Sequence, residues 1–93
     1  MQKITVDGRQ FNALKIETQS APILLIQGES GFLGCGWFSI ETAESLSEAV
    51  AVVRGVQNVA DMLEARVAAV SPAAADRGVR AGMTGKQALP YLN

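Results

Sequence analysis

Gly31-Phe32-Leu33-Gly34-Cys35-Gly36-Trp37-Phe38 is the stretch of this chain in which its rare residue types gather. It holds three of the nine glycines, the only cysteine, the only tryptophan and two of the three phenylalanines. Its glycines allow another backbone, a helix or a ligand to approach closely, and its large apolar side chains favour burial. The stretch therefore predicts a buried junction between a strand and the helix that follows it.

The residues before this junction predict a run of antiparallel strands. Lys3–Val6 alternates in β fashion and leads into Asp7-Gly8, a dipeptide that favours a tight hairpin turn. A return strand is expected over Phe11–Thr18, and the continuous apolar run Ile23–Ile26 is typical of a strand covered on both faces. With the junction itself, these segments make four antiparallel strands.

The residues after the junction predict alternating helices and strands. Each expected helix begins with a side chain that can cap its first turn, and Pro90 is expected to end the last helix early. Because crossover connections place strands in parallel, the chain is predicted to be an α/β (α+β) domain with one mixed sheet of about six strands. The expected helices begin at Ser39, Asn58, Ser71 and Thr84, and the expected strands cover Val50–Val53 and Arg66–Val70.

Size and composition limit what the chain can be. Ninety-three residues, 48% of them apolar, predict one domain over residues 1–93 with a real core. A net charge of -1 gives no basic footprint for nucleic acid, and the apolar runs are too short to cross a membrane. The amino end lacks the pattern of a signal peptide, and one cysteine cannot form an internal disulfide. We expect a cytoplasmic protein.

Cys35 is the candidate nucleophile. Its flanking glycines give access, and the start of the next helix can stabilise a thiolate. However, Leu33 and Trp37 share its face in an extended strand, and the chain contains no histidine to activate it. A buried, packed thiol is the alternative interpretation. Burial would exclude the enzyme hypothesis, and exposure beside Arg54 would support it.

A small anionic ligand is the second hypothesis. Arg54 follows a predicted buried strand, and open α/β sheets bind ligands at the carboxyl ends of such strands. Gly34 and Gly36 allow close approach there, and Lys86, with Arg80, adds positive charge. No spacing of carboxylate or cysteine side chains predicts a metal site. No nucleotide fingerprint is complete, so no cofactor is expected.

Several short segments carry a resemblance to a known family. They are Gly34-Cys35-Gly36 before a helix, Val53-Arg54-Gly55-Val56, the helix containing Asp61-Met62-Leu63, and above all the run Gly78–Leu89. In these segments the chain resembles the YunC-like family of small bacterial and archaeal proteins, over roughly residues 28–89. The resemblance implies a compact α/β domain and brings no established activity, substrate or cofactor.

These observations lead to one main hypothesis and one alternative. The main hypothesis is a self-associating binding or structural module, with a small anionic ligand near Arg54 and the Gly34–Gly36 region. Trp37 and Phe38 are expected to be core or subunit interface. The alternative is an enzyme that uses Cys35 as its nucleophile.

Overall fold

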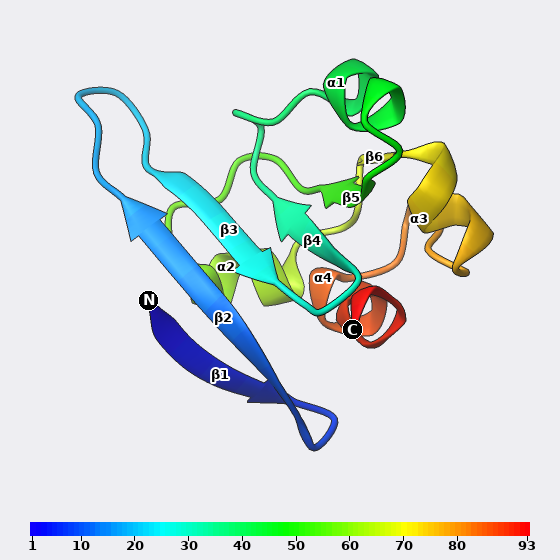
Figure 1. The fold of residues 1–93 in the computed structure, drawn as a ribbon. Helices are drawn as coiled ribbons and strands as arrows, with labels where there is room; N and C mark the ends of the chain where they lie inside the picture. Colours follow the sequence, from blue (N-terminus) through cyan, green and yellow to red (C-terminus); the bar gives the residue numbers. More distant parts are fainter.

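The sheet has six strands that lie side by side in chain order, as the computed structural model of residues 1–93 shows (Figure 1). It is a mixed sheet combined with four short α-helices, so the predicted α/β (α+β) architecture is confirmed. The strands are β1 (Gln2–Val6), β2 (Arg9–Ile16), β3 (Ile23–Gln27), β4 (Gly31–Gly34), β5 (Ala49–Val52) and β6 (Ala69–Val70).

The first four strands form the predicted antiparallel run. Asp7 and Gly8 both take positive φ angles, 51° and 75°, which suits the turn of a two-residue hairpin. Register then places the apolar residues of neighbouring strands opposite each other, as in the pairs Ala13–Ile26 and Ile26–Leu33. One face of β1–β4 is therefore apolar through its middle.

All four predicted helix starts are confirmed. In each case the capping side chain accepts a hydrogen bond from a backbone N–H in the first turn, and Thr84 and Gln87 form a complete capping box. The last α-helix ends before Pro90, as expected, and the chain continues as a 3₁₀ helix. The helices are α1 (Ile40–Ser45), α2 (Val59–Glu64), α3 (Pro72–Asp76), α4 (Gly85–Ala88) and the 3₁₀ helix η1 (Leu89–Leu92).

One part of the expected topology is wrong. All strands of the second half were expected to run in parallel, but only β4 and β5 do so, and β6 pairs with β5 antiparallel. The reason is the short helix α2, which spans about 9 Å. It packs against β2 and β3 and does not return the chain to the edge of the sheet where β5 begins. β6 therefore begins at the edge where β5 ends and runs in the opposite direction.

Two predicted elements are shorter than expected. In the helix after the junction, apolar residues recur at helical spacing from Ile40 to Ala49. The helix nevertheless ends at Ser45, Ser47 takes a left-handed φ of 57°, and Ala49 already belongs to β5. The strand expected over Arg66–Val70 is reduced to Ala69–Val70, because Arg66 forms an isolated bridge with Thr84 instead. Local hydrogen bonds from the Ser47 and Glu48 N–H groups end the helix, whereas a contact with a distant segment shortens the strand.

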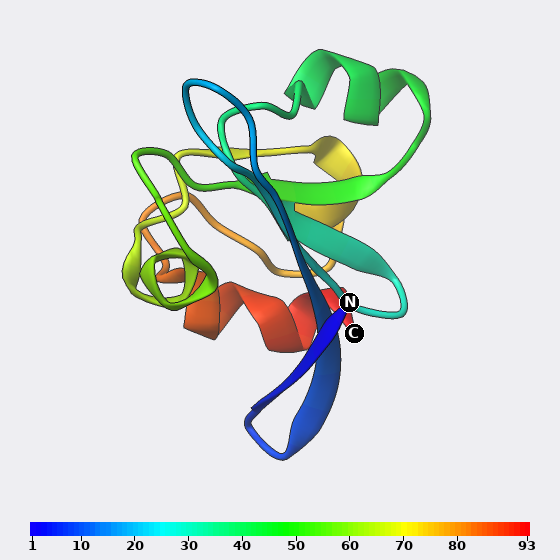
Figure 2. The same cartoon turned by 90° about the vertical axis from the view of Figure 1, so that its left-hand side faces the viewer.

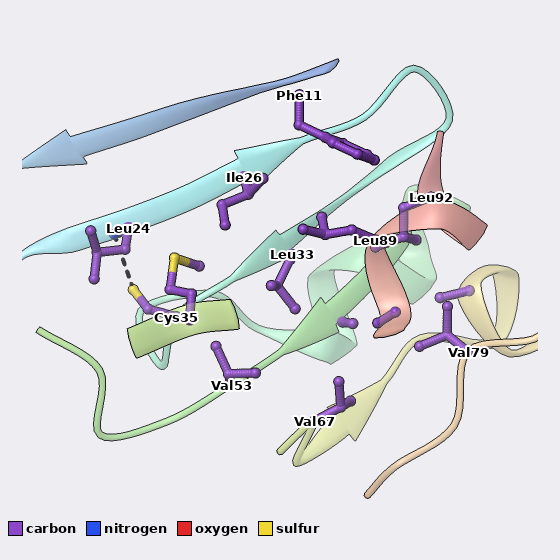
Figure 3. Close-up of a cluster of buried hydrophobic side chains, with 14 of the residues drawn as sticks. Phe11, Leu24, Ile26, Leu33, Cys35, Val53, Val67, Val79, Leu89 and Leu92 are labelled. Atoms are coloured by element: carbon purple, nitrogen blue, oxygen red, sulfur yellow. Dashed lines mark hydrogen bonds between the residues drawn. The ribbon is translucent and has the colours of Figure 1, made fainter. Parts of the chain in front are cut away.

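The side chains on the two faces of the sheet form two separate clusters. The main cluster fills the space between the sheet and α2, α4 and η1, and Figure 3 shows Phe11, Ile26 and Leu33 of the strands gathered with Leu89 and Leu92 of η1. The smaller cluster lies on the opposite face, where Ala43 of α1 packs on Val50 and Val52. In Figure 2, α1 and α4 lie on opposite sides of β4 and β5.

The buried Ser71 hydroxyl ties β5 to α3. Its oxygen accepts from the N–H of Val50 at 2.9 Å and of Ala74 at 3.3 Å, and its O–H donates to the carbonyl of Glu48 at 2.7 Å. These three bonds use the full capacity of a hydroxyl. Ser71 thus caps α3 and completes the backbone hydrogen bonding at the start of β5.

Ser71→Ala is expected to lower the free energy of unfolding by about 2 kcal/mol, because it removes a cap and leaves the buried Val50 N–H without an acceptor. Urea denaturation measures this loss. Ser45→Ala is the control, since the exposed Ser45 hydroxyl bonds only the Thr42 carbonyl of its own helix, and its expected loss is within about 0.5 kcal/mol. Equal losses in the two variants would contradict the assigned role of Ser71.

Candidate functional site

The carboxyl ends of β4 and β5 lie next to each other at one edge of the sheet. After β4 the chain passes to α1 on one face, and after β5 it passes to α2 on the other face. Neighbouring parallel strands whose connections leave to opposite faces open a crevice between them, and ligands of open α/β sheets bind in such crevices. The junction stretch forms one wall of this crevice.

A cavity of about 250 Å³ occupies this position. Its walls come from the loop after β4, the loop after β5 and the segment just before β3. No carboxylate lies in its lining, and four of its eight lining residues are hydrophobic. The lining residues are Ala21, Pro22, Cys35, Gly36, Trp37, Gly55, Val56 and Gln57.

Backbone N–H groups without acceptors surround the cavity. Those of Gly36, Trp37, Gly55 and Val56 donate to no acceptor within the chain. Gly36, Trp37 and Gly55 are exposed residues whose N–H groups water can satisfy, and only Val56 is buried. A ligand that enters the cavity would replace that water as the acceptor.

The carbonyl groups on the facing wall already have donors. The indole Nε1 of Trp37 donates to the carbonyl of Ala21 at 3.2 Å. The carbonyl of Pro22 lies 3.9 Å from the Cys35 Sγ, which is the donor of that contact. The carbonyl groups of Gly36, Trp37, Gly55 and Val56 likewise accept from no donor within the chain, so the loops after β4 and β5 leave both donors and acceptors free at the cavity.

Arg54 lies beside the cavity. Its aliphatic stem runs past Gly36, where an added Cβ would meet the Arg54 Cγ at 3.9 Å. Three other arginines donate to backbone carbonyls, whereas the exposed guanidinium of Arg54 makes no hydrogen bond or ion pair within the chain. The carboxylate of Asp61, seven residues further along the chain, accepts from the Gln57 N–H at 3.0 Å and forms no ion pair with Arg54.

Cys35 is buried, with 3% of its surface exposed. Its Sγ accepts from the N–H of Leu24 at 3.3 Å, the bond drawn in Figure 3, and its remaining contact is with the Pro22 carbonyl. Both partners are backbone groups, and neither can act as a base. The geometry is that of the packed thiol.

The family of the chain is decided by residues 34–92. They match the family model described as "Domain of unknown function (DUF1805)". The chain belongs to this family. The matched residues begin at Gly34 and include both loops that follow β4 and β5, so most of the cavity wall lies within the family domain.

Two further proteins are similar over nearly the whole chain. The uncharacterized protein YunC of Bacillus subtilis (strain 168) is 28% identical over 90 residues, which cover 92% of this chain and 89% of YunC. The crystal structure of TA1206 from Thermoplasma acidophilum, a protein of unknown function, superposes with a TM-score of 0.94 at 28% identity and covers 99% of this chain and 90% of that one. The predicted resemblance to the YunC-like family is confirmed.

The structure brings only some of the predicted site residues together. Gly36 and Cys35 line the cavity, and the stem of Arg54 lies next to Gly36 without being part of the lining. Gly34 lies outside it, buried beneath the Phe38 ring, where any side chain would collide with that ring. Arg80 donates to the carbonyls of Ala75 and Val79 at the end of α3.

Lys86 is exposed on α4, which packs against α2. No cavity of the structure has both Lys86 and Arg54 beside it. The expected convergence of Arg54, Arg80 and Lys86 is therefore not observed, since each of the three belongs to a different segment of the surface.

The position of Trp37 also differs from the one that the sequence predicts. In an extended strand it would share a face with Leu33 and Cys35, but β4 ends at Gly34, and a turn follows in which the Phe38 N–H donates to the Cys35 carbonyl at 3.1 Å. Trp37 is 57% exposed, so it is not core.

Besides Trp37, five residues of the cavity lining were not predicted from the sequence as site residues. Gly55, Val56 and Gln57 follow Arg54 directly, and the rule that ligands bind at carboxyl ends of parallel strands would have found them. Ala21 and Pro22 lie far away in the chain, and no local sequence pattern marks them as site residues.

The fold has no group of three or more metal-ligating side chains and no helix long and apolar enough to span a membrane.

Iodoacetamide is expected to label Cys35 about tenfold or more slowly in the folded chain than in the urea-unfolded chain, because the thiol is buried. Mass spectrometry of the alkylated protein measures both rates. A Cys35→Ala, Ser20→Cys variant supplies an exposed thiol as the reference. Labelling of folded Cys35 at the unfolded rate or faster would revive the nucleophile hypothesis.

Proposed function

We propose that this domain is a cytoplasmic binding module that holds a small anionic ligand in the cavity at the carboxyl ends of β4 and β5. The observation that carries the proposal is the set of free backbone N–H groups of Gly36, Trp37, Gly55 and Val56 around one cavity. Hydrogen bonds to a charged acceptor contribute about 1.5–3 kcal/mol each. Two or three of them suffice for binding in about the millimolar range.

The lining also indicates which kind of anion fits. Pro22, Trp37 and Val56 add apolar surface next to the donors. A ligand with an anionic group and a small apolar body would satisfy both parts of the wall, as a phosphate ester or an aromatic carboxylate does. A bare inorganic anion would use the donors alone and bind more weakly.

The alternative, an enzyme that uses Cys35 as its nucleophile, has less support. The thiol lines the same cavity, but it bonds only backbone groups, and no histidine exists to take its proton. A nucleophilic cysteine needs an adjacent base or a nearby positive group that stabilises the thiolate. Within one chain, we therefore favour binding without covalent chemistry.

Trp37 provides a direct optical readout of the cavity, because it is the only tryptophan and forms part of the wall. Titration with phenyl phosphate is expected to change its fluorescence in a saturable way, and inorganic phosphate is expected to bind more weakly. Sodium chloride at equal ionic strength controls for screening. A fluorescence that no anion changes in a saturable way would contradict the proposal.

Arg54→Ala is expected to weaken phenyl phosphate binding about fivefold, because an exposed charge beside an anion contributes up to about 1 kcal/mol. Arg9→Ala is the matched control, since Arg9 is also exposed and unpaired but lies at the β1–β2 hairpin. The Trp37 titration measures both variants. An equal loss of affinity in the two variants would mean that only the net charge of the protein affects binding, and it would contradict a contact between Arg54 and the ligand.

A further inference from the structure

Strand β1 is an open edge of the sheet. In the strand order β1 to β6 it has a neighbour on one side only, and β2 is the only element with which it makes extensive contact (Figure 1). Native sheets protect such edges with a proline, a bulge or several charges. β1 has an unbroken register with β2, no proline and one charged residue, Lys3. The edge can therefore accept a further strand.

The backbone groups that point outward from β1 belong to Lys3 and Thr5. Val6 and Arg9 flank the two-residue turn of the hairpin, so they form a hydrogen-bonded pair. Hydrogen-bonded pairs alternate along an antiparallel ladder, so Ile4 also bonds β2, and the residues on either side of it turn away from β2. The N–H and C=O groups of Lys3 and Thr5 are therefore free for a partner strand.

These outward groups are complementary to those of a second copy. Two β1 strands that meet antiparallel about a twofold axis at Ile4 place Lys3 of each copy opposite Thr5 of the other. The two residues of such a pair exchange both of their hydrogen bonds, as every hydrogen-bonded antiparallel pair does. No outward group of Lys3 or Thr5 is then left without a partner.

The side chains also suit this register. Lys3, the one charged residue of β1, lies opposite the neutral Thr5 and not opposite its own copy, so no like charges meet across the axis. Ile4 is half-buried at the margin of the main cluster, and the axis brings it beside Ile4 of the other copy, which covers its exposed part. The net charge of -1 causes little repulsion between two copies.

The opposite edge of the sheet favours a closed dimer over an open chain of copies. That edge is β6, which has only two residues and offers few backbone groups for pairing. Pairing of β1 with β6 of the next copy would continue without end as a filament, whereas pairing of β1 with β1 closes after two copies.

We propose that this chain forms a homodimer through antiparallel pairing of β1 with β1 of a second copy, which joins two sheets into one continuous sheet. In this mode of association the main-chain hydrogen bonds supply affinity, and the register of the side chains supplies specificity. The proposal does not depend on the anion cavity, because β1 contributes no residue to its lining.

Amide hydrogen exchange followed by NMR tests the pairing directly. The N–H groups of Lys3 and Thr5 have no acceptor in a single copy, so they are expected to exchange at least about tenfold more slowly in the dimer than in the monomer. Their protection is expected to rise between about 20 μM and about 1 mM protein, because a short strand pair associates weakly. The N–H of Ile4, which bonds β2, is the internal reference and is expected to be protected at both concentrations. Fast exchange of Lys3 and Thr5 at the higher concentration would overturn the proposal.

Two variants of Thr5 test the register. Thr5→Lys places a second positive charge opposite Lys3 of the other copy, and Thr5→Glu places a carboxylate there. Sedimentation equilibrium is expected to give a dissociation constant about fivefold larger for the first variant and about fivefold smaller for the second. Thr5 is exposed, so both variants are expected to fold, and circular dichroism checks this. If one variant fails to fold, the other still tests the register.

The same two substitutions at Gln19 control for net charge, because Gln19 is exposed between β2 and β3 and lies outside β1. They are expected to leave the dissociation constant within about twofold of the wild-type value. A wild-type chain that stays monomeric at about 1 mM would overturn the proposal. Equal effects of the substitutions at Thr5 and at Gln19 would overturn it as well, because the copies would then associate through another surface.

Discussion

The parallel contact between β4 and β5 is the constraint on which the rest of the structure depends. It is the one parallel pair of the sheet, and it is close because Gly31 has no side chain that would collide with the carbonyl of Ala49. Since the two strands run together, both of their loops start at the same edge. Since the loops then leave to opposite faces, a crevice opens between them, and the cavity that we propose to bind an anion lies there.

Trp37 lies between two hollows of the surface. It lines the cavity at the carboxyl ends of β4 and β5 and also an apolar groove beside α1. The indole is fixed at one point, where its Nε1 bonds the carbonyl of Ala21, while most of the ring stays exposed.

The sequence predicts those parts of the fold that local chemistry controls. The helix starts at Ser39, Ser71 and Thr84 were predictable, because a cap bonds a backbone group three residues away. The direction of β6 was not predictable, because it depends on where α2 packs against the sheet. The meeting of Gly36 with Arg54 was predictable from their places after two strands, but no local pattern indicates that Ala21 and Pro22, which lie far away in the chain, complete the wall.

The central claim is that the free N–H groups around the cavity bind an anion. Amide chemical shifts of ¹⁵N-labelled protein, followed while phenyl phosphate is added, test it most directly. The account predicts saturable shifts at Gly36, Trp37, Gly55 and Val56, with one common dissociation constant and little change at Gly82 or Lys86, which lie outside the cavity. Shifts that are absent, that do not saturate or that spread evenly over the surface would contradict it.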